Sequence, residues 1–386
     1  MYAGHCRQVS NRDRCKRALT LALAIGLSAS AACDGSPTVR PFIVGTAPNA
    51  QDWSQFFVER QLDLQMPKSG PPLIRIGKIA VGNDGQLFVP EGRGRRILVF
   101  ASDGHLDREI QGGPKGSFKL EMLGAMALDQ DGNVFISDPS SNWVTVLGPP
   151  LFETIRRFQL KTPIADMIVL QDSSIVTYFP DDAEGVFRHF DPKGNLLGVS
   201  QKVNDARLRI FSGRIQNGGI VKDSSGGLFG MEPSKYRLIH FARNFEVREV
   251  LRGGLDTLWS PDSRPFPSRL NPKGYGPEHE RWWDSFMHIG RPFAPARGIL
   301  LVSIFASDGM SIAEEFANVY RMDGRVLAQG LRVPHNGHIV GAGGGRVYVV
   351  RNAHLVGDSS MAPLQLYEYT WKGTDAATIA ARHGDQ

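Results

Sequence analysis

Charged residues recur just after short apolar runs, at positions where several of them could share one site. Four acids and one arginine stand there: Glu91, Asp138, Asp181, Glu232 and Arg351. Carboxylate oxygens from several strand ends can hold Ca²⁺ or bind a polar ligand, which would place these residues at the rim of a funnel. The alternative is structural, because an acid at a strand end often accepts hydrogen bonds from backbone N–H groups in the following bend.

Aromatic and arginine side chains gather in the longest stretch that lacks regular apolar alternation. Such side chains dominate recognition surfaces, and Trp-lined grooves also suit sugars and extended peptides. The alternative is that the rings turn inward and form a small core of their own. With one histidine from a later connection, the candidate binding face comprises Trp259, Arg281, Trp282, Trp283, Phe286, His288, Arg291 and His354.

Two histidines and an asparagine occur together at His335, Asn336 and His338. They could bind a metal or move a proton, but ten His among 386 residues make a chance pairing common. The sequence has no Cys pair for zinc, no His-Glu-x-x-His, no nucleophile elbow and no phosphate-binding Gly-rich motif. We therefore assign no catalytic residues and no metal ligands.

Tight-turn signals recur along the chain and indicate which elements must position these residues. In the first copy, Asn83-Asp84-Gly85 separates two short apolar runs, and Asp103-Gly104 follows a third. Asp-Gly between such runs supplies the positive φ that a hairpin turn needs, so each copy is predicted to be a four-strand antiparallel meander. The second turn of the meander recurs at Gly148-Pro149, Pro192-Lys193-Gly194, Arg243-Asn244, Asp323-Gly324 and Lys372-Gly373.

The spacing of these copies predicts the architecture. Successive second turns lie 45 to 50 residues apart except for one gap of 80, which indicates six copies and one insertion. The last copy lacks a fourth strand, and the alternation of Leu62, Leu64 and Met66 near the start fits the missing one. The predicted fold is all-β: a six-bladed β-propeller of four-stranded antiparallel blades, with the ring closed by an N-terminal strand.

The repeats also set the expected domain boundaries. We expect a signal peptide over 1–32, a lipid-anchored tether over 33–55, the propeller over 56–373 and a C-terminal tail over 374–386. An insertion at about 252–284 separates the fourth and fifth blades. Because tight turns occupy one face, the long connections at 201–216, 252–284, 306–316 and 351–363 should share the other. Long loops on a rigid scaffold usually carry binding sites.

Residues 112–138 resemble the NHL-type repeat of six-bladed propellers. Gly112-Gly113-Pro114-Lys115-Gly116-Ser117-Phe118 matches its Gly-rich linker and Phe, and 127–138 matches its apolar-Asp strand, Gly-Asn turn and apolar strand ending in Asp. The resemblance implies the fold rather than an activity, since unrelated functions share such propellers. It also implies that the Asp at the strand end satisfies backbone groups.

The first 33 residues differ from the rest of the chain. Five basic residues precede an apolar run over 18–32, a pattern that predicts a secretory signal. The position of Cys33 resembles a bacterial lipoprotein signal, in which this cysteine is acylated, although Ser30 stands where that family usually has Leu. We expect an exported, lipid-anchored protein of the cell envelope that faces the periplasm. The alternative is ordinary cleavage, which would leave a soluble periplasmic protein.

The charge balance argues against nucleic acid as a partner. The chain has 44 Lys and Arg against 39 Asp and Glu. Residues 1–32 hold five of the bases and one of the acids, so the remainder has 39 bases and 38 acids. A nearly neutral chain offers no strong field to phosphate backbones. No second apolar run reaches membrane-spanning length, so we expect the lipid anchor to be the only membrane contact. We also expect a monomer.

Two functional hypotheses remain. The favoured one is a non-catalytic module that binds a protein, peptide or glycan through the long-loop face and needs no cofactor. The other is a metal-dependent hydrolase, lactonase or lyase with its site in the central funnel. The metal would be Ca²⁺, as in gluconolactonase-like and paraoxonase-like six-bladed enzymes, or Zn²⁺. The full Glu, Asn, Asn, Asp set of those families is not found at the starts of innermost strands, although Asn217 and Asn336 stand in comparable places.

Overall fold

The structure is a computed structural model. It describes residues 38–41, 52–64, 76–91, 95–113, 120–180, 182, 184–202, 218–233, 236–252, 267, 276–308, 311–351 and 365–373. The chain divides into two compact units, Met1–Ser36 and Pro37–Gln386, and all of these residues belong to the second unit. The expected signal peptide, Cys33 and the C-terminal tail lie outside the described residues. No helix in the described ranges is long and apolar enough to cross a membrane.

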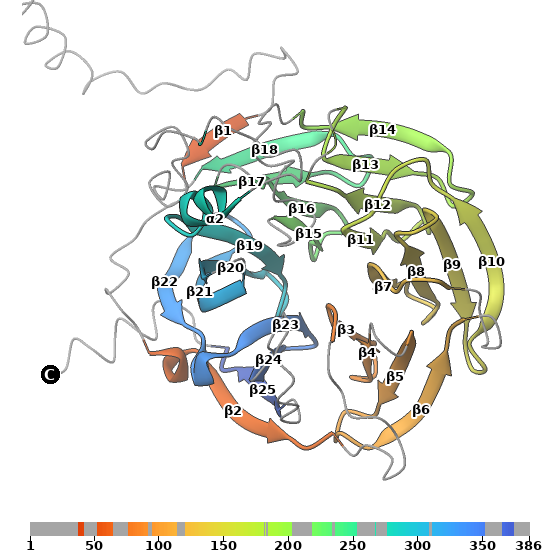
Figure 1. Ribbon diagram of the computed structural model, residues 1–386, viewed down its shortest axis with the longest axis horizontal. Coiled ribbons are helices and arrows are strands. Elements are labelled where there is room, and N and C mark those ends of the chain that lie inside the picture. Colours follow the sequence, from red (N-terminus) through yellow and green to blue (C-terminus); the bar gives the residue numbers. More distant parts are fainter. Residues whose placement is uncertain are drawn as a thin grey trace, which may run out of the picture. The chain divides into compact units, whose positions relative to one another are not determined.

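Six antiparallel sheets of the second unit are arranged in a ring, as predicted (Figure 1). Blade 1 contains β3 (Ala80–Val81), β4 (Leu87–Glu91), β5 (Arg96–Phe100) and β6 (Leu106–Gln111). Blade 2 contains β7 (Met126–Leu128), β8 (Val134–Asp138), β9 (Trp143–Gly148) and β10 (Glu153–Gln159). Blade 3 contains β11 (Asp166–Val169), β12 (Ile175–Tyr178), β13 (Phe187–Phe190) and β14 (Leu196–Ser200). Blades 4 and 5 contain β15 (Gly219–Lys222), β16 (Leu228–Met231), β17 (Arg237–Phe241), β18 (Val247–Arg252); and β19 (Met287–Phe293), β20 (Ile299–Asp308), β21 (Ser311–Arg321), β22 (Val326–Arg332). Blade 6 contains β23 (His338–Gly343), β24 (Arg346–Arg351), β25 (Gln365–Trp371) and β2 (Phe57–Leu62).

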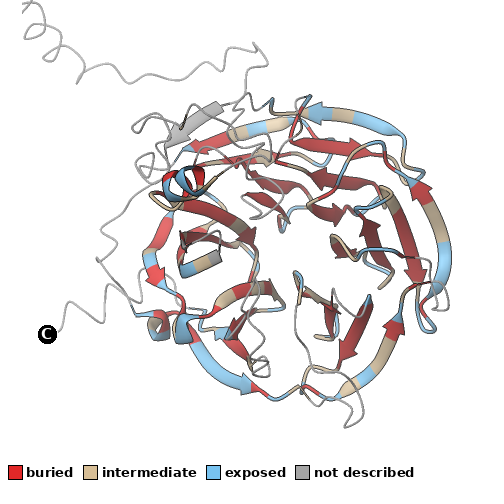
Figure 2. Ribbon diagram, viewed as in Figure 1, coloured by how far each residue is buried: buried red, intermediate tan, exposed pale blue. Residues whose placement is uncertain are grey.

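The hydrophobic core lies between the blades. In the described chain, buried side chains form six clusters, each shared by two neighbouring blades. Phe88 and Val99 of blade 1, for example, pack with Val134 and Ile136 of blade 2. The middle strands are therefore buried on both faces, whereas the outer strands alternate between buried and exposed (Figure 2). A single meander has no partner for either face, so the ring is the unit that folds.

The ring is closed by a strand from the N-terminal side, as the sequence predicts. β2 pairs antiparallel with β25, with Phe57 opposite Trp371 and Leu62 opposite Leu366. The strand lies earlier in the chain than predicted, since β2 ends at Leu62, where the predicted alternation begins. The residues before β2 hold it in place. Trp53, in the 3-10 helix η1 (Trp53–Gln55), stacks on Phe57 with ring centroids 4.6 Å apart. A further short strand, β1 (Thr38–Pro41), pairs in parallel with β18 at the outer edge of blade 4.

Tight turns join the first strand of each blade to the second, and in blades 1 to 5 they also join the third strand to the fourth. In blade 2, Oδ1 of Asp129 accepts hydrogen bonds from the N–H groups of Asp131 (3.0 Å) and Asn133 (2.9 Å). Gly132 then takes a φ of +79°, which other residues adopt only with strain. The Asp-Gly signals therefore mark these turns because the side chain of Asp and the freedom of Gly are both used.

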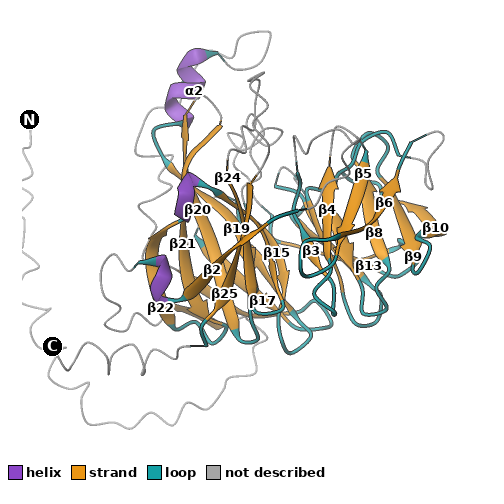
Figure 3. Ribbon diagram, turned by 90° about the horizontal axis from the view of Figure 1, so that it is seen from below, coloured by secondary structure: helices purple, strands orange, loops and turns teal. Residues whose placement is uncertain are grey.

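The remaining connections lie at the opposite end of the ring, which we call the long-connection end. β14 ends at Ser200 and β15 begins at Gly219, while β18 ends at Arg252 and β19 begins at Met287. The second of these connections includes the helix α2 (Pro277–Trp283), which lies beyond the strands on the side away from the short turns (Figure 3). The prediction of a long loop over 306–316 is wrong. β20 and β21 continue through it, pairing Ser307 with Ile312 and Asp308 with Ser311.

Candidate functional site

Two of the predicted rim residues are buried acids that pair with arginines of their own blade. Glu91 ends β4 and lies 3.5 Å from Nε of Arg96, the first residue of β5. Glu232 follows β16, and both of its carboxylate oxygens accept hydrogen bonds from the guanidinium group of Arg237 at the start of β17. Each pair joins the second strand of a blade to the third. The role of these acids in the structure is therefore to fasten a strand-to-strand bend.

Asp138, the rim acid of blade 2, binds the backbone. Its carboxylate accepts hydrogen bonds from the N–H groups of Glu121 (3.0 Å), Met122 (3.3 Å) and Ser140 (3.0 Å). Burial raises the pKa of Asp138, but the hydrogen bonds from Ser140 and Glu121 outweigh it and hold the pKa below its usual value. This is the structural alternative considered for these acids.

The last two rim positions have different environments. Asp181 lies outside the described residues. The next residue is also an acid, Asp182, and its Oδ2 accepts a hydrogen bond from Nε of Arg188 at 2.5 Å. The acid-to-arginine pair of blades 1 and 4 thus recurs in blade 3. Arg351, the last residue of β24, is exposed.

The aromatic residues of the predicted binding face are mostly buried. Trp282, Trp283 and Phe286 are 6%, 1% and 7% exposed, and His288 is fully buried. The imidazole of His288 stacks on Trp283 with centroids 4.1 Å apart, and Trp282 meets the edge of Phe286 at 5.1 Å. These four side chains therefore form a small core rather than an open recognition surface. Arg281 is exposed on α2, while Trp259 and His354 lie outside the described residues.

Polar contacts fasten the end of α2 to blade 5. Nε2 of His288 lies 3.1 Å from the carbonyl oxygen of Trp283, and Oγ of Ser307 donates to Oδ1 of Asp284 at 2.6 Å. Burial lowers the pKa of His288 from its usual 6.5 to about 3, so this side chain is neutral at physiological pH. The last turn of the insertion is thereby fixed to β19 and β20.

The two histidines near 335 are engaged separately. His335 stacks on Tyr367 with centroids 4.1 Å apart, and its Nε2 lies 3.0 Å from Oε1 of Glu59. His338 instead faces Glu315, with Nδ1 3.3 Å from Oε2. The two imidazoles thus contact different carboxylates, and the structure does not bring them together as a pair.

A charged pair that the sequence did not point to joins two blades that are not neighbours. Lys78 precedes β3 of blade 1, and its Nζ lies 2.8 Å from each carboxylate oxygen of Asp166, the first residue of β11 in blade 3. Nζ also lies 3.3 Å from the carbonyl oxygen of Ile220 in blade 4. Asp166 is 2% exposed and further accepts hydrogen bonds from the N–H groups of Met167 and Ile220. The pair therefore sits where the innermost strands approach the axis of the ring.

Arg291 of blade 5 lies beside this pair and is placed by a β-bulge. In β19, Ile289 pairs with Ile304 and Pro292 pairs with Val302, so Gly290 and Arg291 both oppose Ser303. The N–H of Arg291 donates to Oγ of Ser303 at 3.0 Å. A β-carbon on Gly290 would lie 2.0 Å from the same Oγ, so only glycine fits there. Bulges of this kind redirect a side chain, here Arg291.

Arg291, Lys78 and Asp166 together carry a net positive charge. Cγ of Arg291 lies 3.6 Å from the position that a β-carbon on Gly219 would take, and Oδ2 of Asp166 lies 2.9 Å from the same position. Burial lowers the pKa of Lys78; the carboxylate of Asp166 opposes this, and the charge of Arg291 adds to it. Asp166 neutralises one cation, and no carboxylate among the described residues forms an ion pair with Arg291. This end of the axis can therefore attract an anion.

Of this site, sequence reasoning found Arg291 and missed Lys78 and Asp166. Lys78 interrupts the apolar run Ile76-Gly77-Lys78-Ile79, and Asp166 begins an apolar strand. A charge within an innermost strand was the available signal. Its meaning depends on which strand is innermost and on the contact between residues 88 positions apart.

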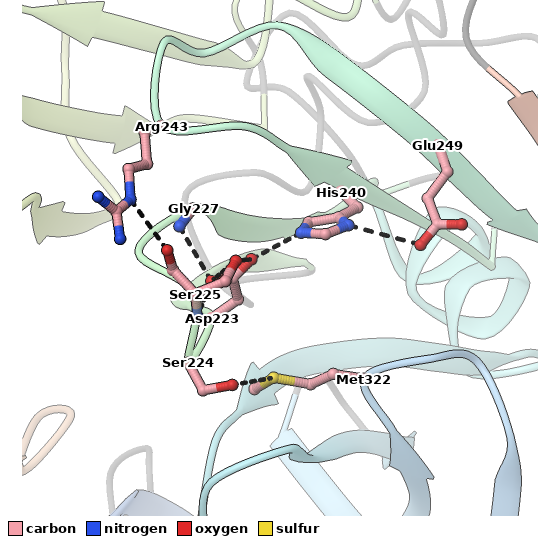
Figure 4. A network of polar contacts seen from close by, with 8 residues as sticks. All are labelled: Asp223, Ser224, Ser225, Gly227, His240, Arg243, Glu249 and Met322. Carbon is pink, nitrogen blue, oxygen red and sulfur yellow. Dashed lines mark hydrogen bonds and ion pairs between the residues drawn. The ribbon is translucent and has the colours of Figure 1, made fainter.

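A second polar network lies at the tight-turn end of blade 4 (Figure 4). Oδ2 of Asp223 lies 2.6 Å from Nε2 of His240, whose Nδ1 lies 3.4 Å from Oε1 of Glu249. Burial raises the pKa of Asp223, but bonds from His240, Ser225 and the backbone lower it to about 2. The carboxylate also caps the turn through Gly227 N–H, so it is part of the hairpin. No cluster of three or more metal-binding side chains occurs in the described ranges.

Comparison with known proteins gives likeness in fold. No family model matches the chain, and no curated protein is similar in sequence. A "putative exported protein" from Bacteroides fragilis is 13% identical over 87% of this chain and 100% of its own, with a TM-score of 0.59. A DUF4221 family member from Bacteroides vulgatus is 9% identical over 82% of this chain and 96% of its own, with a TM-score of 0.54. At these identities the likeness shows the propeller fold alone.

Proposed function

We propose that this chain is an exported binding protein that holds a peptide, or a peptide segment of a protein, at the long-connection end of its propeller. The observation that carries the proposal is Arg291, a partly buried cation beside the ring axis with no carboxylate partner in the described chain. It lies at the end where the connections 201–218 and 253–286 join the blades. Long connections, together with a charge that has no ion-pair partner among the described residues, support ligand recognition at the long-connection end.

A binding role is favoured over a catalytic one by the state of the acids. Glu91, Asp182 and Glu232 each pair with an arginine of their own blade, and Asp166 pairs with Lys78. A general acid or base must reach a substrate proton, whereas these carboxylates are committed to contacts within the fold. This supports recognition without chemistry.

A peptide is favoured over a glycan by where the aromatic rings lie. Sugar sites commonly stack the ligand on exposed aromatic faces, but Trp282 and Trp283 are buried. The large apolar side chains that are exposed in the described residues are Val58, Met122, Leu151, Ile155, Leu196, Leu197 and Val199, none of them aromatic. The exposed apolar side chains of the described surface thus include no aromatic ring, while polar and backbone groups near the axis suit a peptide.

The location follows from the leader sequence. The basic segment, the apolar run over 18–32 and Cys33 support export and acylation of Cys33. An acyl chain at Cys33 would hold the protein at a membrane. Mass spectrometry of the mature protein tests this, since an unmodified residue 33 would overturn the anchor.

The binding function is tested by titrating the mature protein with a synthetic pool of random peptides. A variant at the long-connection end, Arg281→Gln/Arg351→Gln, is compared with a matched variant at the tight-turn end, Arg297→Gln/Arg325→Gln; all four arginines are exposed. We expect binding by the wild type, a loss of about threefold or more in the first variant from weaker electrostatic steering, and no change in the second. Absence of binding by the wild type, or equal losses in both variants, would overturn the proposal.

A further inference from the structure

We propose that Arg291 receives the terminal carboxylate of the bound peptide, an inference that rests on the peptide-binding function above. A guanidinium group presents paired N–H donors in a plane, and this arrangement matches the two oxygens of a carboxylate. The neighbouring cation, Lys78, adds to the positive field without needing to contact the ligand, because Asp166 already holds it.

The backbone of blade 5 is built to aim this side chain. The bulge at Gly290 and Arg291 breaks the register of β19, and the hydroxyl of Ser303 accepts the N–H of Arg291 at 3.0 Å. A glycine at 290 leaves space for that hydroxyl, and a glycine at 219 leaves space for Oδ2 of Asp166. The bulge and Ser303 thus fix the backbone that carries this cation, and preorganised recognition sites lower the cost of binding in this way.

Arg291 differs from the arginines of the third strands, because they have carboxylate partners. The guanidinium groups of Arg96, Arg188 and Arg237 each contact a carboxylate of their own blade. Arg291 is partly buried and has no such carboxylate in the described part of the chain. Removing part of a charge from water without a counter-charge is unfavourable, so an incoming anion would be stabilised there.

The contacts beneath the site explain why a chain end, rather than a side chain in mid-sequence, would occupy it. Lys78 spans from blade 1 to blade 3, and Lys222 spans from blade 4 to blade 2, where its Nζ lies 3.1 Å from the carbonyl oxygen of Leu128. Both side chains therefore reach between blades that are not neighbours, on the inner side of the ring. An extended ligand that enters from the long-connection end would meet these side chains, and we place its terminus beside Arg291.

The test uses one random peptide pool made twice, with a free carboxyl end and with an amidated end. Wild type, Arg291→Gln, Arg291→Lys and the control Arg297→Gln are titrated with both pools, and acetate and glucuronate serve as competitors. Arg297 lies in the turn that follows β19, at the other end of the same blade, and is exposed. Thermal melting confirms that each variant is folded. If Arg291→Gln is not folded, Arg291→Lys is used in its place, because it keeps the cation.

We expect the amidated pool to bind the wild type about tenfold or more weakly than the free acid, as for a lost hydrogen bond to a charged group. Arg291→Gln should bind both pools alike, Arg291→Lys should retain part of the preference for the acid, and Arg297→Gln should behave as wild type. Acetate should compete with the free-acid pool.

Three results would overturn the inference. Equal binding of acid and amide by the wild type would remove the carboxylate site while leaving the peptide-binding function in place. Failure of both pools to bind would remove both proposals. Binding of glucuronate without binding of either pool would assign the site to a sugar acid instead.

Discussion

The ammonium group of Lys78 lies 2.8 Å from each carboxylate oxygen of Asp166 and so links the first blade to the third on the inner side of the ring. Neighbouring blades are held together by apolar clusters, but blades 1 and 3 share no such cluster among the described residues. The pair is therefore a direct contact between two blades that are separated by blade 2. Buried pairs of this kind are most costly when one partner is removed, because the other charge remains.

Lys78→Met should destabilise the protein by about 3 kcal/mol, since it leaves the carboxylate of Asp166 buried without its counter-charge. The double variant Lys78→Met/Asp166→Asn should be more stable than the sum of the two single losses implies. Urea denaturation of all four proteins measures this coupling in a double-mutant cycle. Additive losses would contradict a direct interaction between the two side chains.

Acid should weaken the contact between α2 and blade 5 through His288. Its folded pKa of about 3 lies below its usual 6.5, so the unfolded chain binds the extra proton first. Stability is then complete above pH 6.5 and falls as the pH drops toward 3, by about 2 kcal/mol at about pH 5. His288→Phe, which keeps a ring against Trp283, should lose this part of the pH dependence. Denaturation of the wild type and of His288→Phe at about pH 5 and above pH 6.5 measures this. An unchanged dependence of the unfolding free energy on pH in the variant would contradict the prediction.

Asp223 should show the dependence expected of an acid with a depressed pKa. Its folded pKa is about 2 against a usual 3.8, so its contribution is present above about pH 4 and is lost as the pH falls toward 2. Asp223→Asn should therefore cost about 2 kcal/mol at neutral pH and little at low pH. Asp131→Asn, in the exposed part of another turn, is the matched control and should cost almost nothing. The free energy of unfolding of both variants across this pH range is the measurement.

Gly290→Ala should displace Arg291 without changing any charge. The added methyl group would lie 2.0 Å from Oγ of Ser303, so the bulge must shift at a cost of about 1–3 kcal/mol. Peptide binding should fall as it does in Arg291→Gln. The double variant Gly290→Ala/Ser303→Gly removes the clash and should recover most of the stability, as thermal melting would show. Full binding by Gly290→Ala alone would mean that the bulge does not position the arginine.

The fold was predictable from the sequence because its signals are local. Asp129 and Gly132 form a turn with residues within four positions, and an Asp side chain accepts from the backbone of a turn in blades 1, 3, 4 and 5 as well. Counting these turns gives the blades, and the missing fourth strand gives the closure. The extension of β20 and β21 was not predicted, since Ser307, Asp308 and Gly309 have the composition of a loop while the register of a long hairpin pairs the first two.

The candidate site was predictable only in part because it depends on direction and on distant contacts. Arg291 was found through its aromatic neighbours, yet those neighbours turned inward, and sequence alone does not give the orientation of Trp282 or Trp283. Lys78 and Asp166 lie on different blades, so only the arrangement of the innermost strands brings them together. The likeness of residues 112–138 to the NHL-type repeat informs the blade and says nothing of this site.

The pairing of β2 with β25 has a consequence for how the protein is made. Phe57 cannot pair with Trp371 until β25 has been synthesised, so β2 stays unpaired while the first five blades assemble. Exposed strand edges invite association with other chains, and pairings between distant segments form slowly. Folding of this protein therefore includes an interval in which it can associate wrongly with other chains, and this interval ends when β2 pairs with β25.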